Sequence, residues 1–175
     1  MRKTLAVLMA LVMVLAIAAV AAAEEAPFTF HNGVQFGMSM DQIQAVETGR
    51  YEYDNEHTHG PVDFAELEYE HTKVDGIRAE VKYLFVGNGL VAIRVNYETR
   101  DISYKQLKDN LTAKYGPAGA VDKALLANGI YAVDDDGRLE RQSEAIVAGN
   151  VMIVLELDED DIDVTFVDLT AAYVK

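Results

Sequence analysis

Hydrophobic residues recur at every second position along three consecutive segments in the middle of the chain. The apolar members are aliphatic or aromatic, and most of the residues between them carry charge; the segments are 65–70, 77–85 and 91–97. Turn residues separate the segments, at Asp75-Gly76 and at Gly87-Asn88-Gly89. A period of two with glycine-containing turns is typical of antiparallel strands that bury one face. We therefore predict a three-stranded meander here.

Two short amphipathic helices are predicted, one before this meander and one after it. Each begins with a Ser-x-x-Gln capping box, in which the serine hydroxyl and the glutamine side chain satisfy backbone amides at the helix start. The boxes are Ser39 to Gln42 and Ser103 to Gln106. Apolar residues then recur every three or four positions. Gly49 and Gly116-Pro117 are expected to end the two helices.

The remaining segments complete the prediction of fold class. Residues 50–63 are polar and contain Gly60-Pro61, which indicates a loop. Val151–Leu157 and Ile162–Leu169 are strand-like and are joined by the acidic residues 158–161. Residues 118–150 leave the number of later strands open, between two and four. We predict an α+β fold with helices on one face of an antiparallel sheet, and the element order also suggests duplicated helix-plus-meander units.

The N-terminal residues 1–23 have the pattern of a signal peptide. Arg2 and Lys3 precede an apolar run, and Ala21-x-Ala23 before two glutamates fits a cleavage site. A membrane anchor is the alternative, since about 18 apolar residues can span a bilayer. The alanine-rich end and the lack of a basic flank favour cleavage. We expect a single exported domain over residues 24–175, secreted or held in the periplasm or cell envelope.

Composition narrows the possible functions of that domain. The chain has no cysteine, so packing alone must hold an exported fold, and thiol chemistry is excluded. It has 29 acidic and 15 basic residues, and removing Arg2 and Lys3 with the leader leaves 13 bases and a net charge of −16. Such a charge opposes binding to nucleic acid and to anionic lipid. No stable membrane insertion is expected after cleavage.

Two segments resemble a known group of proteins. Phe36–Glu47 (FGMSMDQIQAVE) resembles the first-helix motif of small bacterial secreted proteins and lipoproteins of unknown function, and Leu111–Pro117 (LTAKYGP) resembles their second-helix ending. The layout is similar to the beta-lactamase inhibitor protein fold and to the small lipoprotein subunit of the outer-membrane assembly machinery. The resemblance implies helices against one face of an antiparallel sheet. The lipobox cysteine and the inhibitor's paired cysteines are missing, so no functional residue is carried over.

Candidate metal ligands are few and poorly placed. His57-Thr58-His59 would present two rings on one side of an extended chain, with Asp54, Glu56 and His71 near in sequence, but zinc needs three or four converging ligands. Residues 134–137 and 158–163 are rich in aspartate without the EF-hand spacing. We expect a solvated loop and acidic turns, and we predict no metal or other cofactor.

No catalytic motif is recognisable. The serines after the leader are Ser39, Ser103 and Ser143, two of which act as helix caps, and no G-x-S-x-G occurs. We expect a non-enzymatic binding or protein-interaction module whose partner is another envelope or extracellular protein; its binding residues are unknown. The alternatives are a small secreted hydrolase with an unrecognised carboxylate site and a divalent-metal-binding protein. A hydrolase would need a cleft with a carboxylate of raised pKa.

Overall fold

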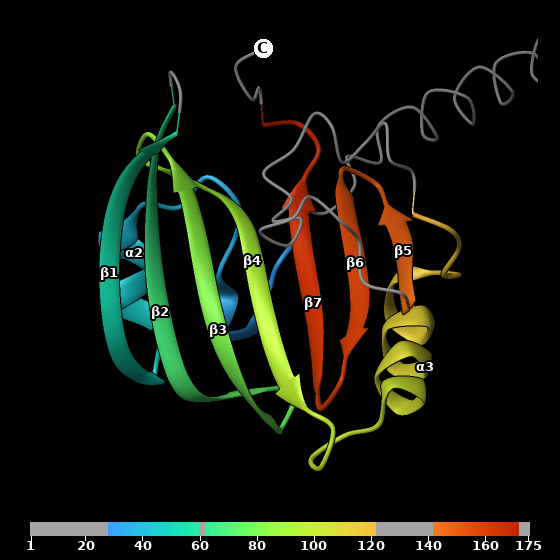
Figure 1. The fold of residues 1–175 in the computed structure, drawn as a ribbon. Helices are drawn as coiled ribbons and strands as arrows, with labels where there is room; N and C mark the ends of the chain where they lie inside the picture. The colour runs from blue at the N-terminus through green and yellow to red at the C-terminus, as the bar shows by residue number, and fades with distance from the viewer. Residues whose placement is uncertain (1–27, 60–61, 122–141, 172–175) are drawn as a thin grey trace, which may run out of the picture.

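The computed structural model describes residues 28–59, 62–121 and 142–171, with the backbone alone over 53–59 and 62–64. It contains one seven-stranded antiparallel sheet (Figure 1), in the order β1-β2-β3-β4-β7-β6-β5. The elements in chain order are the 3-10 helix η1 (His31–Gly33), α2 (Met40–Val46), β1 (Arg50–His59), β2 (Val62–Val74), β3 (Ile77–Val86), β4 (Gly89–Glu98), α3 (Tyr104–Tyr115), β5 (Gln142–Ala148), β6 (Val151–Asp158) and β7 (Asp161–Asp168).

Two runs of consecutive hairpins make up the sheet. Strands β1 to β4 each pair with the next strand in the chain, and so do β5 to β7. The runs meet where β4 pairs with β7, with Ile93 opposite Phe166. The predicted strands of the meander and of the C-terminal hairpin are confirmed as β2, β3, β4, β6 and β7. Strand β5 lies in the stretch that the sequence left open.

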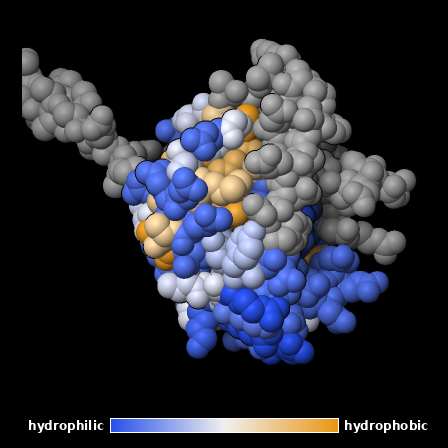
Figure 2. Space-filling model, turned by 90° about the vertical axis from the view of Figure 1, so that its left-hand side faces the viewer, coloured by the Kyte–Doolittle hydropathy of each residue, from blue (hydrophilic) through white to orange (hydrophobic). Residues whose placement is uncertain are grey.

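The predicted loop over residues 50–63 is wrong, because most of it is strand. Strand β1 occupies Arg50–His59 and pairs with β2, with a bulge between Tyr51 and Tyr53. In the described part of the chain β1 is an edge strand, and charged residues on an edge strand prevent pairing with other molecules. Viewed from the β1 side, hydrophilic residues fill the lower part of the surface, below a smaller apolar patch (Figure 2). The polar composition therefore reflects position at the edge rather than a loop.

Both predicted capping boxes are present. The Ser39 and Ser103 side chains accept from the backbone amides of Gln42 and Gln106, and each glutamine side chain reaches back to the cap residue. Helix α3 ends where expected, with Gly116 at a φ of 112°. The capping signal thus located both helix starts correctly.

Gly49 has a different role from the one predicted. Helix α2 ends at Val46, and Glu47 already has an extended backbone, so Gly49 is not the helix stop. A Cβ at Gly49 would lie 2.0 Å from the Thr72 hydroxyl oxygen and 3.1 Å from Tyr69 Cβ. Glycine is needed here because the chain passes directly against β2 on its way into β1.

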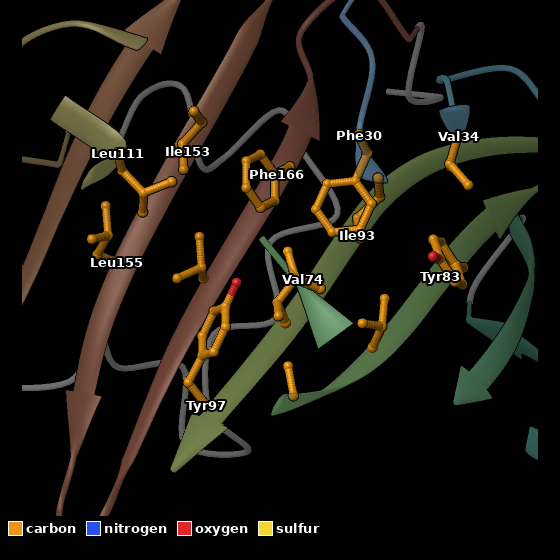
Figure 3. Packing of buried hydrophobic residues seen from close by; sticks show 14 of the residues in the cluster. Phe30, Val34, Val74, Tyr83, Ile93, Tyr97, Leu111, Ile153, Leu155 and Phe166 are labelled. Atoms are coloured by element: carbon orange, nitrogen blue, oxygen red, sulfur yellow. The ribbon is translucent and has the colours of Figure 1, made fainter. Parts of the chain in front are cut away.

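Buried apolar side chains lie on both faces of the sheet. On the core face, which carries Val81, Tyr83 and Val95, the main apolar cluster also contains Phe30 and Val34 from either side of η1 (Figure 3). The second face has a smaller cluster, made of Leu84, Ala92, Ala145, Met152, Val154 and Val167. The alternation predicted that the meander buries one face only, and this is wrong. Leu84 and Ala92 point to the face opposite the core face and are buried as well.

The two helices lie at opposite ends of the strand order, α2 by β1 and β2, and α3 by β5 (Figure 1). Lys108 Nζ lies 2.6 Å from Glu144 Oε1, and the Tyr104 hydroxyl donates to Glu144 Oε2 at 3.1 Å, so α3 is tied to β5. None of the helices in the described ranges has the length and apolar character needed to cross a membrane.

Candidate functional site

One candidate binding site is a cleft of about 520 Å³ at one end of the sheet. The segment before α2, the last residue of α3, the β5–β6 turn and the end of β7 surround it. Its described lining residues are Phe28, Gln35, Phe36, Tyr115, Ala148, Gly149, Asn150, Val151, Asp168 and Thr170. This volume falls within the range of small-ligand pockets, roughly 300–1,000 Å³. We call it the aromatic cleft.

Three half-buried rings, Phe28, Phe36 and Tyr115, give the cleft its apolar character. Phe28 stacks on Phe36 with ring centroids 5.1 Å apart and lies 6.1 Å from Tyr115. Behind them Phe166, which is almost fully buried, is 5.6 Å from Phe28 and 6.2 Å from Tyr115. Aromatic pairs at such separations stabilise each other beyond simple burial. The cluster therefore anchors the segment before α2 to β7 and lines the cleft at the same time.

Polar groups form the rim of the aromatic cleft. Asp168 Oδ1 accepts hydrogen bonds from the backbone amide and the hydroxyl of Thr170, at 2.8 and 2.7 Å, which orders the end of β7. The Asn150 carbonyl accepts from the Leu169 amide at 2.8 Å. No lysine or arginine is among the described lining residues, and Asp168 is the one carboxylate among them. The lining therefore suits uncharged or cationic ligands better than anions.

A second cluster of polar groups lies buried within the core. Glu47 follows α2, and its side chain is fully buried. Glu47 Oε2 accepts from the Tyr83 hydroxyl at 2.5 Å and lies 3.1 Å from His31 Nε2, while Oε1 accepts from the backbone amides of Thr48 and Gly49. Because the Tyr83 hydroxyl donates its hydrogen bond to Glu47, His31 serves as a donor in this arrangement. The carboxylate thus connects η1, α2 and β3.

The surroundings of Glu47 hold it in the ionised form. Burial alone would raise its pKa, but hydrogen bonds from His31 and Tyr83 and the amide of Thr48 lower the pKa to about 2. Burial and the Glu47 charge together raise the pKa of Tyr83 far above its usual range. Both groups therefore keep one protonation state at physiological pH. We interpret this network as structural, because its members are enclosed in the core.

A third group of residues surrounds a cavity of about 160 Å³ at the second face. Glu80 lines it together with Glu70, His71, Asn96 and Glu98. Partial burial raises the pKa of Glu80 to about 6, and the neighbouring Glu68 carboxylate adds to the effect. This is the feature that the hydrolase alternative requires, a carboxylate of raised pKa beside a cavity.

The register of β1 against β2 separates the backbone of His57, which pairs with Phe64, from His71, which follows the Glu70 partner of Arg50. His57 and His59 lie on β1, where the backbone alone is described, whereas His71 lies at the bulge of β2 with a φ of 57°. The His71 ring contacts Arg78, with Nδ1 and Nη2 2.8 Å apart. Among the side chains that the structure describes, no three histidine, aspartate or glutamate residues are grouped so that they could hold a metal ion.

One of the two predicted acidic turns lies in the described structure and the other does not. Residues 158–161 form the β6–β7 turn, with Asp158 opposite Asp161, as predicted. The turn predicted at Asp136-Gly137 lies outside the described residues. Burial and the charges of Asp163 and Glu98 raise the pKa of Asp161. Such repulsion marks a turn whose carboxylates crowd one another.

The sequence did not locate the aromatic cleft or the Glu47 network. Two aromatic residues, Phe28 and Phe30, precede the first helix and are the signal in the sequence that could have pointed here. Asp168, Asn150 and Tyr115 come from separate elements, and only the β4–β7 pairing brings the two halves together. Glu47 is one of many glutamates, and no sequence feature distinguishes it from the others.

Comparison with known proteins adds no assignment. No family model matches the chain, and searches of curated proteins and of solved structures give no match.

Proposed function

We propose that the protein is an exported, non-enzymatic binding or protein-interaction module. The observation that carries this proposal is the aromatic cleft, with its three half-buried rings and a polar rim. Large concave sites lined by aromatic residues with a few polar groups are the usual form of a ligand or partner site. Aromatic side chains also dominate the binding energy of protein interfaces.

The compartment and the kind of partner follow from the sequence. The signal-peptide pattern of residues 1–23 supports action in the periplasm, the cell envelope or the medium. The partner is then another envelope or extracellular protein, since the acidic charge opposes nucleic acid and anionic membranes. The secreted protein should begin at Glu24 when its N-terminus is sequenced. Recovery of Met1 in a membrane-bound form would contradict this part of the proposal.

Site-specific crosslinking tests the proposal in the native envelope. A photo-reactive phenylalanine analogue replaces Asn150 at the rim of the cleft, or Glu52 on β1 at the opposite end of the strand order. Both side chains are exposed, so neither replacement disturbs the core. We expect a discrete crosslinked partner from position 150 and not from position 52. Equal products from both positions, or none from position 150, would argue against a binding role for the cleft.

The hydrolase alternative rests on Glu80. A carboxyl group with a pKa of about 6 beside a cavity can act as a general acid near neutral pH. The test is hydrolysis of chromogenic glycosides and esters by the wild-type protein and by Glu80→Gln. Activity that falls as pH rises through about 6 and is lost in the variant would replace the binding proposal with this one.

We also propose that the two helices share the core face and that the halves are duplicated units. Ile43 of α2 and Leu107 and Leu111 of α3 belong to one apolar cluster, which supports a shared face. The two identical capping boxes, each followed by consecutive hairpins, support duplication. Such an arrangement is the one expected for the beta-lactamase inhibitor protein-like and outer-membrane assembly lipoprotein superfamily.

A further inference from the structure

We propose that the aromatic cleft binds an aromatic side chain presented by an uncharged or basic polypeptide segment. This inference rests on the proposed binding function and names the chemistry of the ligand. Three observations support the inference: the size of the cleft, the arrangement of its rings and the charge of its rim.

The size of the cleft suits one large side chain together with part of its backbone. Its volume of about 520 Å³ exceeds what a single ring fills. Next to the rings, the rim offers the side chains of Asn150 and Gln35, both exposed. Carboxamides can donate to and accept from a peptide backbone. An aromatic residue in an extended segment would therefore fill the apolar part and bond at the rim.

The ring geometry favours an aromatic side chain over a sugar. A sugar-binding platform presents a flat, exposed ring face, whereas the lining rings here are half-buried and inclined to one another. Phe28 is stacked on Phe36 with the ring planes 20° apart and is inclined by 39° to Tyr115, while the buried Phe166 behind them is inclined by 70° to Tyr115. Another ring can join such a cluster in an edge-to-face or offset contact.

The charge of the site selects against acidic ligands. Asp168 lies on the rim, no basic residue is among the described lining residues, and the whole chain has a net charge of −14. The ammonium of Lys114 lies 5.1 Å from the Tyr115 ring centroid, but it is paired with Asp75 at 3.5 Å. The net charge therefore disfavours a phosphate or carboxylate, whereas a lysine or arginine beside the aromatic residue would be attracted to Asp168.

Titration with small probes tests the ligand class directly. The purified protein is titrated with N-acetyl-phenylalaninamide, N-acetyl-leucinamide, N-acetyl-phenylalanine carboxylate and di-N-acetylchitobiose, and binding is followed by NMR. We expect the aromatic amide to perturb Asn150, Gly149 and Tyr115 and to bind about tenfold more tightly than the carboxylate. The disaccharide should leave these signals unchanged. Stronger binding of the disaccharide, or aromatic binding elsewhere, would overturn the inference.

Two variants keep the test independent of folding. Ala148→Phe places a ring in the cleft from β5 and should weaken binding of the amide about tenfold or more. Tyr51→Ala, which removes an aromatic residue that is 47% exposed on β1, is the matched control and should bind as wild type. If Ala148→Phe unfolds, a blocked cleft is obtained with Asn150→Trp. Unchanged affinity in a folded, blocked variant would contradict the inference.

The outcomes separate this inference from the proposed function. If a partner crosslinks from position 150 but the aromatic amide does not bind, the ligand class is wrong and the binding function stands. If neither occurs, both proposals fail.

Discussion

Two partly or fully buried glutamates, one on each face of the sheet, respond to burial in opposite ways. Glu47, against the core face, has its pKa lowered to about 2, whereas Glu80, on the second face, has its pKa raised to about 6. Burial raises the pKa in both cases, so burial does not explain the difference. The neighbouring groups explain it, because three kinds of hydrogen-bond donor contact Glu47, whereas another carboxylate lies beside Glu80.

The two glutamates have opposite effects on the stability of the fold. Around Glu47, His31, Tyr83 and two backbone amides satisfy the charge, as a buried carboxylate requires. Around Glu80, Glu68 and Glu70 add negative charge that Lys82 only partly offsets. A satisfied network stabilises a fold, whereas crowded like charges reduce its stability. We therefore expect substitutions on the two faces to change the free energy of unfolding by different amounts and in opposite directions.

The largest difference should come from two neighbours on β3. Val81 is fully buried on the core face, and Val81→Asp would place an unpaired carboxylate there, at a cost of several kcal/mol. Glu80→Ala, one residue earlier and on the second face, should change the stability by about 1 kcal/mol or less. Chemical denaturation of both variants measures the difference. Similar midpoints would show that the register of β3 is reversed.

The next largest effect should come from acid titration of Glu47. Its folded pKa lies below the ordinary value of 4.5, so its contribution is complete above that pH and is lost as pH falls toward about 2. The lowering corresponds to about 3 kcal/mol. Glu47→Gln should therefore be less stable than wild type at pH 7 by about this amount.

The pH dependence distinguishes the charge from the shape of the Glu47 side chain. The gap between wild type and Glu47→Gln should narrow steadily between pH 4.5 and pH 2 when unfolding is followed by circular dichroism. A gap that stays constant across this range would mean that packing, and not the ionised carboxylate, holds η1 to β3.

These two glutamates also show what the sequence can and cannot predict. Alternation correctly placed Val81 inward and Glu80 outward, since side-chain period depends on local sequence alone. The capping boxes at Ser39 and Ser103 are equally local and were found for the same reason. The contacts of Glu47 are not local: Tyr83 lies 36 residues away.

The same reasoning explains the errors. Strand β1 was missed because its polarity reflects a place at the sheet edge, which depends on strand order and not on composition. The aromatic cleft was missed because its rings come from distant parts of the chain, with Phe28 before the first helix and Tyr115 at the end of α3. The candidate site depends on contacts between residues that are far apart in the sequence, and local sequence patterns do not predict such contacts.

A smaller effect of opposite sign is expected from Glu80→Gln. Because the folded pKa of Glu80 is raised to about 6, wild-type stability should fall as pH rises from 4.5 through 6. The neutral amide removes this penalty, so the variant should be more stable at pH 7, by about 1 kcal/mol after allowance for solvent screening. Thermal unfolding at pH 5 and pH 7 measures it. A destabilised variant at pH 7 would mean that the Glu80 charge is paired.

The smallest effects should come from two buried hydroxyl groups, one on each face. The Tyr83 hydroxyl donates to Glu47, whereas the Thr165 hydroxyl, in a residue that is 2% exposed, has no hydrogen-bond partner in the described structure. Tyr83→Phe should therefore cost about 1 kcal/mol. Thr165→Val keeps the side-chain shape beside Val154 and removes an unsatisfied polar group, so it should stabilise by about 0.5–1 kcal/mol. Denaturant midpoints that shift in the same direction for both variants would show that the Thr165 hydroxyl is bonded, and that the second face is as well satisfied as the core face.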